Sequence, residues 1–149
     1  MIKIIEESPM GNREKMQSLL PLHYDELTKN KNIMILEPDY DKYQVLEDAG
    51  VLFGLYAYED DKLVGYSLNI VSPHLHYKSV IMCSNDLLFL TPEKRQGRVG
   101  LLLIKETERV AKERGCNFML WHAKENTALS AILPKMNCKV QEIMYSKEL

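Results

Sequence analysis

The segment from Asp86 to Leu103 limits the possible folds more than any other part of this chain. It begins as an apolar run typical of a buried strand, continues through a loop with two glycines and two arginines, and opens directly into the most regular helical pattern of the sequence. The apolar stripe of that helix consists of Val99, Leu102, Leu103 and Val110, and Gly115 marks its end. A strand that leads straight into a long amphipathic helix predicts a domain in which helices cover a sheet.

The rest of the pattern predicts that this sheet is mixed. Residues 51–58 and 63–71 are rich in aromatic and branched side chains and are separated by polar residues, so we expect a β-hairpin. Further strands are expected at 3–7, 80–90, 116–121 and 139–145, and helices within 12–28, where Pro21 divides the stretch, and at 38–46, 99–114 and 126–136. This order predicts an α/β (α+β) fold around one sheet, in a single domain over residues 1–149.

Composition excludes several classes of protein. With 46% apolar and 27% charged residues the chain is typical of a globular protein, and no apolar run reaches the ~20 residues that span a bilayer, so we expect no membrane contact and a cytoplasmic location. Cys83, Cys116 and Cys138 are widely spaced and form no C-x-x-C pair, which predicts buried, reduced thiols. The net charge of −2 argues against a nucleic-acid partner.

The net charge hides a division between the two parts of the chain. Residues 1–90 hold 8 Lys and Arg against 14 Asp and Glu, whereas residues 91–149 hold 11 against 7, which gives balances of −6 and +4. Eight of the acidic residues lie between Glu37 and Asp61, with Lys42 as the only basic residue there. An acidic part is therefore joined to a basic part, and the basic part contains the glycine-bearing loop.

That loop has the physical properties of an anion site. Backbone amides at a helix N-terminus point outward, glycines allow close approach, and Arg95 and Arg98 add positive charge, a combination that suits a pyrophosphate. The other interpretation is an ordinary helix start. Neither the Walker pattern Gly-x-x-x-x-Gly-Lys nor the dinucleotide pattern Gly-x-Gly-x-x-Gly is present.

The run Arg95-Gln96-Gly97-Arg98-Val99-Gly100 resembles the signature of the GNAT superfamily of N-acetyltransferases, Arg/Gln-x-x-Gly-x-Gly/Ala. It departs from that signature at Arg98, where the family usually has glycine. The preceding strand, the strand 118–121 and Asn126 at the start of the next predicted helix support the resemblance, which covers essentially the whole chain. The chain also resembles compact acetyltransferase-like proteins of bacteriophage genomes, which would place it in the host cytoplasm.

The resemblance implies a GNAT-like mixed central sheet with splayed strands flanked by helices, and acetyl-CoA as co-substrate. Backbone groups of Leu88, Phe89 and Leu90 would pair with the pantetheine arm, and the amides of Gln96, Gly97, Arg98, Val99, Gly100 and Leu101 would hold the pyrophosphate. Asn126 would reach the pantetheine, or it is a plain helix N-cap. The Arg98 side chain either reaches the 3′-phosphate of CoA or weakens the site.

Acyl transfer to an amine needs a base, and two candidates follow from the sequence. Asp86 lies in an apolar strand, where a carboxylate either faces a cleft or is bonded to nearby backbone. His122, just after the neighbouring strand, is the second candidate, with a packing role as its alternative. His74 and His76 have no evident third ligand, so no metal is expected.

The resemblance also shows where the pattern is incomplete. The tyrosine that many family members use to reprotonate the CoA thiolate falls on Leu133 here, and Tyr145 in the predicted last strand is a possible substitute. The sequence therefore predicts an N-acetyltransferase acting on a cationic amine or a protein lysine, with the acidic part of the chain on the acceptor side, and a homodimer is possible. Two alternatives stay open: a non-catalytic acyl-CoA-binding or interaction module, and a nucleotide-phosphate binder of another α/β type.

Overall fold

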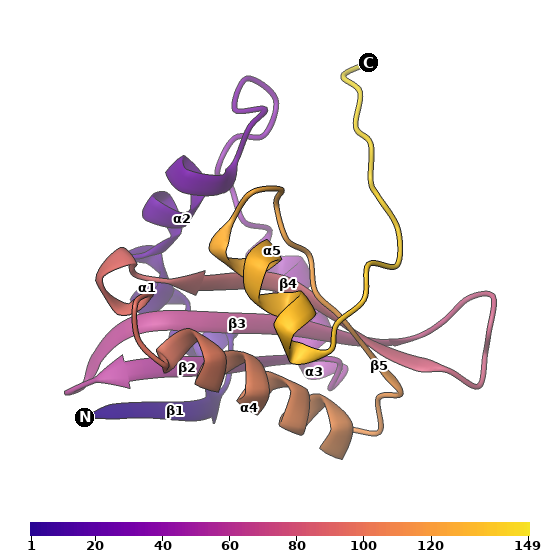
Figure 1. The fold of residues 1–149 in the computed structure, drawn as a ribbon, viewed down its shortest axis with the longest axis horizontal. Helices are drawn as coiled ribbons and strands as arrows, with labels where there is room; N and C mark the ends of the chain where they lie inside the picture. The colour runs from indigo at the N-terminus through magenta and orange to yellow at the C-terminus, as the bar shows by residue number, and fades with distance from the viewer.

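The computed structural model describes residues 1–149 and contains one five-stranded sheet in the order β1-β2-β3-β4-β5 (Figure 1). The first four strands pair antiparallel with their neighbours, and β5 pairs parallel with β4. The strands are β1 (Ile2–Glu7), β2 (Leu52–Glu59), β3 (Lys62–Pro73), β4 (Ile81–Leu90) and β5 (Phe118–Leu120). The predicted mixed α/β class is confirmed.

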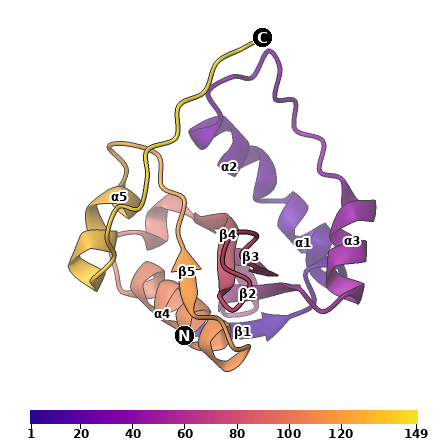
Figure 2. The ribbon, with the colours of Figure 1, turned by 90° about the vertical axis from the view of Figure 1, so that its right-hand side faces the viewer.

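Helices cover both faces of the sheet, as Figure 2 shows along its edge. The N-terminal helices α1 (Arg13–Gln17), α2 (Leu20–Leu27) and α3 (Tyr40–Asp48) lie on one side, and α4 (Val99–Glu113) lies on the other with α5 (Ala128–Ile132) above it. Each face has its own apolar core. One core joins α1 and α2 to Tyr56, Tyr66 and Phe89, and the other joins α4 to Phe53, Leu55 and Cys83.

The β2–β3 hairpin forms where aromatic and branched residues predict it. Seven successive residues of β2, Leu52 to Tyr58, are buried because both faces of this central strand are covered by helices. The turn at Asp60 and Asp61 has left-handed backbone conformations, with φ of 47° and 69°, which fit the twist of a tight hairpin.

The C-terminal part differs from the prediction. Residues 139–145 form no strand: the segment after Met136 has no regular structure and is almost wholly exposed, with Asn32 contacting Glu148. Residues with strand propensity form a strand only where a neighbouring strand completes their hydrogen bonds, and β5 is just three residues long. The predicted helix at 126–136 is shorter too, an α-turn at 128–132 followed by a 3-10 turn from Leu133 to Met136.

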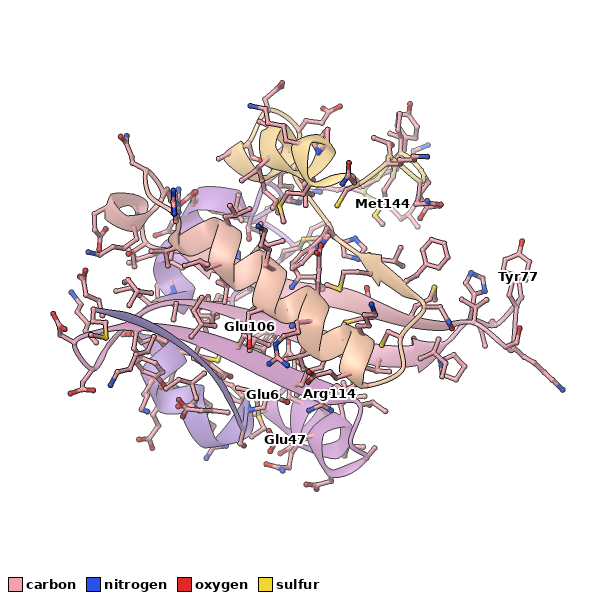
Figure 3. All side chains as sticks on the ribbon, turned by 60° about the horizontal axis from the view of Figure 1, so that its bottom comes forward. Glu6, Glu47, Tyr77, Glu106, Arg114 and Met144 are labelled. Atoms are coloured by element: carbon pink, nitrogen blue, oxygen red, sulfur yellow. The ribbon has the colours of Figure 1, made fainter.

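Ion pairs and buried groups fix the remaining segments, and Figure 3 labels several of the side chains. Arg114, after α4, pairs with Glu6 of β1, and Glu47 of α3 accepts hydrogen bonds from Ser8 and from the amide of Met10. Tyr77 lies at the far tip of the long β3–β4 hairpin (Figure 3).

No helix has both the length and the apolar character needed to cross a bilayer. All three cysteines are free thiols, but only Cys83 is fully buried, so the predicted burial is wrong for the other two.

Candidate active site

The site is built on the edge where β4 and β5 separate. The two strands pair only where Met82, Cys83 and Ser84 face residues 118–120, so the part of β4 from Asn85 to Leu90 has no neighbour on that side. A strand edge without a neighbour presents amide and carbonyl groups that are free to bind an extended ligand. The predicted splaying of the two strands is thus confirmed, and Leu88, Phe89 and Leu90 lie along the open edge.

A β-bulge places Asp86 at the start of this edge. On the β3 side, Leu68 pairs with Leu87 and Asn69 pairs with Asn85, so Asp86 is an extra residue without a partner on β3. Bulges bend a strand and redirect its side chains, and they are common beside active sites. The side chain of Asp86 is exposed although its neighbours in the strand are partly or fully buried.

A buried polar cluster lies directly beneath the bulge. Asn85 is 4% exposed, and its side-chain amide lies within 3.3 Å of Leu68 O, Leu87 O, Asn69 Oδ1 and Ser67 Oγ. The Thr107 hydroxyl of α4 donates to Leu103 O and is 3.0 Å from Ser67 Oγ. Because Leu68 and Leu87 lie on the two strands that form the bulge, the Asn85 amide joins both strands and fixes its shape.

Tyr43 of α3 is the direct partner of Asp86. Its hydroxyl donates to Asp86 Oδ2 at 2.5 Å. Burial, with the carboxylate as a second cause, raises the pKa of Tyr43, so this phenol stays protonated and remains a donor at neutral pH. The carboxylate is thereby held in one orientation and keeps its other oxygen free to accept a proton.

His122 and Asn126 lie on the segment that follows β5. The Nε2 atom of His122 is 3.0 Å from Ser84 Oγ, two residues before Asp86 on β4, and its ring is exposed. Asn126 has a left-handed backbone with φ of 59° and an exposed side chain. It is not the N-cap of α5, because Thr127 caps that helix with its hydroxyl on the Ser130 amide.

The loop before α4 exposes a row of backbone donors. None of the six amides from Gln96 to Leu101 donates to a backbone carbonyl, and no side chain caps the helix; the first helical bond runs from Leu102 N to Arg98 O at 2.9 Å. A Cβ at Gly97 would meet nothing within 4 Å, and one at Gly100 only Leu90 Cδ2 at 3.6 Å. Packing within the fold therefore does not require glycine at either position, and the backbone there is open to close approach.

The two arginines of this loop are used differently. The Arg95 guanidinium forms a bidentate ion pair with Glu26 of α2 at 2.6 and 2.7 Å, and its Nε donates to Leu90 O at 2.8 Å. Arg95 thus ties the loop to α2 and to the end of β4, and it occupies one carbonyl of the open edge. Arg98, the N-cap residue of α4, is exposed and forms no ion pair.

A cavity of about 300 Å³ opens on the other side of Asp86, between β3, β4 and the N-terminal helices. Eleven of its fifteen lining residues are hydrophobic, and Tyr43 and Leu87 form the wall nearest to Asp86. The acidic segment from Glu37 to Asp61, which the sequence places on the acceptor side, contributes little to the lining of this cavity. Only Glu37 of its eight acidic residues lines it. Glu59 and Asp60 lie at the β2–β3 turn, where they pair with Lys94 and the N-terminus.

The structure thus brings Asp86, Leu88–Leu90 and the amides of 96–101 to one strand edge, with His122 on the adjoining segment. Sequence reasoning missed Tyr43, Asn85 and Glu26, since each acts through a contact with a residue more than 15 positions away. An Asn-Asp pair inside an apolar strand was the one available sign of the bulge. The structure places no three His, Cys, Asp or Glu side chains together as metal ligands.

Comparison with solved structures shows the same fold over the full chain. An aminoglycoside acetyltransferase, HMB0005, from an uncultured soil metagenomic sample matches with a TM-score of 0.78 at 13% identity, covering 100% of this chain and 99% of that one. Ribosomal-protein-alanine N-acetyltransferase from Brucella melitensis biovar Abortus 2308 matches with a TM-score of 0.73 at 15% identity. AAC(6′)-Iy, in complex with the bisubstrate analogue CoA-S-monomethyl-acetylneamine, matches with a TM-score of 0.71 at 19% identity. Both comparisons cover 100% of this chain and 99% of the other chain.

Sequence comparison gives the family directly. No curated protein sequence matches the chain significantly. The model of the acetyltransferase (GNAT) family matches residues 16–133, a range that includes the whole strand edge, the bulge and the loop before α4. This chain therefore belongs to the acetyltransferase (GNAT) family.

Proposed function

We propose that the protein transfers the acetyl group of acetyl-CoA to a primary amine. The observation that carries the proposal is the set of six unpaired amides at 96–101, which lie at the end of the open edge of β4. A phosphate group suits the amides, and an extended amide-containing arm suits the edge. Acetyl-CoA has both parts, and a structure of the same fold holds a CoA-containing bisubstrate analogue.

In this proposal Asp86 is the general base. The amine nitrogen attacks the thioester carbonyl, the proton of the amine passes to Asp86 directly or through one water, and collapse of the tetrahedral intermediate breaks the C–S bond to release CoA as a thiolate. Amides of the β4 edge near the bulge are the donors available to the oxyanion. Tyr43 holds the carboxylate in place, and His122 is the second candidate base.

The structure supplies no tyrosine as acid for the thiolate. Leu133, at the position where the family's tyrosine would fall, is buried, and Tyr145 is 88% exposed in the C-terminal segment. Solvent is then the proton source. This same observation favours the second candidate function, a module that binds acyl-CoA without turnover.

Turnover and binding measured on one preparation separate the two functions. We expect acetyl-CoA to raise the melting temperature and a panel of amines to release thiol. Asp86→Asn, which keeps the shape and the acceptor for Tyr43, should lower kcat by ~10²-fold or more with acetyl-CoA affinity unchanged. Asp41→Asn in the same acidic region, exposed on α3, is the matched control and should leave kcat unchanged.

The outcomes distinguish the candidates clearly. Acetyl-CoA binding without thiol release from any amine identifies the non-catalytic module. Absence of acetyl-CoA binding contradicts both functions. Full activity in Asp86→Asn makes the carboxylate structural and leaves His122 as the base to test.

Three finer expectations stay predictions that accompany this function. They are a cytoplasmic location, a homodimer, and the bacteriophage-type subgroup within the family. The second is directly measurable by sedimentation of the purified chain.

A further inference from the structure

The cavity next to Asp86 has walls whose chemistry selects the acceptor. Its hydrophobic residues come from α1, α2, α3, β3, β4, the loop before α3 and the turn at Met10, and its charged ones are Arg13 and Glu37. We propose that the acceptor is a small monoamine on an apolar body, such as an arylalkylamine, and not a polycation. This inference rests on the proposed acetyl transfer and names the substrate class for it.

Tyr43 and Leu87 connect the cavity to the reacting groups. The Tyr43 ring lines the cavity while its hydroxyl binds Asp86, and Leu87 follows Asp86 along β4 and lines the same wall. Asp86 itself does not line the cavity, but it lies one hydrogen bond beyond Tyr43 and one position before Leu87, so an apolar body in the cavity has this carboxylate just behind the Tyr43 wall for its amine. The amine nitrogen then faces the bulge, where the open edge of β4 begins.

The outer wall of the cavity is held in place. It consists of residues 34–38, and the Tyr24 hydroxyl of α2 donates to Met34 O at 2.7 Å. Ile33, Met34 and Ile35 are 56%, 58% and 66% exposed, which is unusual for three large apolar side chains in succession. Of these, Met34 and Ile35 line the cavity, and Ile33 does not.

Desolvation favours an apolar monoamine over a polycation. An apolar wall disfavours the charged form of a bound amine, which lowers the pKa of the amine and increases the neutral, nucleophilic form. Each additional ammonium group of a polyamine or aminoglycoside would have to give up water, with Glu37 as the single carboxylate on the wall and Arg13 repelling it. The volume of about 300 Å³ is at the small end for ligand pockets, which also favours a small body.

The test measures kcat/KM with saturating acetyl-CoA for phenethylamine and hexylamine against spermidine, kanamycin and a lysine-containing peptide. We expect kcat/KM for the two apolar amines to exceed that for the polycations and the peptide by ~10-fold or more. Equal or higher values for spermidine, kanamycin or the peptide overturn the inference while the proposed acetyl transfer stands. If acetyl-CoA binds but no amine is acetylated, the proposed function fails, and this inference fails with it.

A matched pair of variants locates the apolar body. Ile35→Asn makes the exposed wall polar and should raise KM for phenethylamine by roughly 10-fold, with KM for acetyl-CoA unchanged. Ile33→Asn makes the same change two residues away, outside the cavity, and should leave both KM values unchanged. Equal effects of the two variants, or no effect of Ile35→Asn, contradict the placement.

Discussion

The Asn85 side chain beneath the bulge should be worth far more stability than an asparagine usually is. Asn85→Ala removes a 4% exposed amide that has four acceptors within 3.3 Å. An NH₂ group has two hydrogens, so two of these contacts are full bonds at one time. Their loss costs about 2 kcal/mol, and the buried acceptors left without a donor, together with the space vacated, add about 1–2 kcal/mol more.

We therefore expect Asn85→Ala to lower the free energy of unfolding by about 3–4 kcal/mol, measured by urea unfolding with linear extrapolation. Asn32→Ala is the matched control, since Asn32 is exposed and its amide has one contact, with Glu148 at 3.0 Å; its effect should stay within about 0.5 kcal/mol. A loss below about 1 kcal/mol for Asn85→Ala would refute the view that this amide holds the two strands together.

The same variant carries a functional consequence. Because the bulge directs Asp86, Asn85→Ala should lower kcat at a temperature where circular dichroism shows the variant folded. Unchanged kcat in a folded but destabilised variant would show that the bulge keeps its shape without the cluster.

Two further predictions concern His23 and Gly100. Burial lowers the pKa of His23 to about 4 from 6.5, so the unfolded chain takes up the proton first, and stability is lost as the pH falls below about 6.5 until the loss levels off near pH 4. Between pH 7 and pH 5 this group should lower the free energy of unfolding, measured with urea, by about 2 kcal/mol. His23→Gln should remove that pH dependence, and His76→Gln, at an exposed histidine, should keep it. An unchanged pH profile in His23→Gln would contradict the assignment to His23. Gly100→Ala should leave the melting temperature equal or higher, because the added Cβ meets only Leu90 Cδ2 at 3.6 Å. The same variant should weaken acetyl-CoA binding by ~10-fold in calorimetry. Unchanged affinity would show that no ligand approaches this backbone.

The sequence predicts those parts of the site that are local in the chain. The loop from Arg95 to Gly100, the helix after it and the hairpin depend on neighbouring residues, so spacing alone identified them. The edge at Leu88–Leu90 was expected only from the resemblance to the family. The partner of Asp86 was out of reach, because Tyr43 comes from a helix 43 residues away and nothing in the local pattern of either segment indicates the pair.

Arg95 and the C-terminal segment show two other reasons why the structure differs from what the sequence predicts. The pattern correctly marked Arg95 as part of the loop, but its engagement depends on Glu26 of α2, a tertiary contact. The apolar residues of 139–145 have strand propensity, but propensity does not indicate whether a strand edge is present beside them to complete the pairing. The local sequence thus predicts the hydrogen-bond donors of the loop before α4. Tertiary contacts, such as that of Arg95 with Glu26, determine which of these donors are free.

The extra residue in β4 also changes the phase of the strand. Before it, the odd-numbered Cys83 and Asn85 face α4; after it, the even-numbered Leu88 and Leu90 do, while Leu87 faces α2 with Phe89. Deleting Asp86 would remove the bulge, because Asn85 and Leu87 would then be adjacent opposite Asn69 and Leu68, and each would keep its partner on β3 and its face of the sheet. Substitution at this position probes the chemistry of the carboxylate, whereas deletion would remove the bend in β4 and leave each half of the strand in its own core.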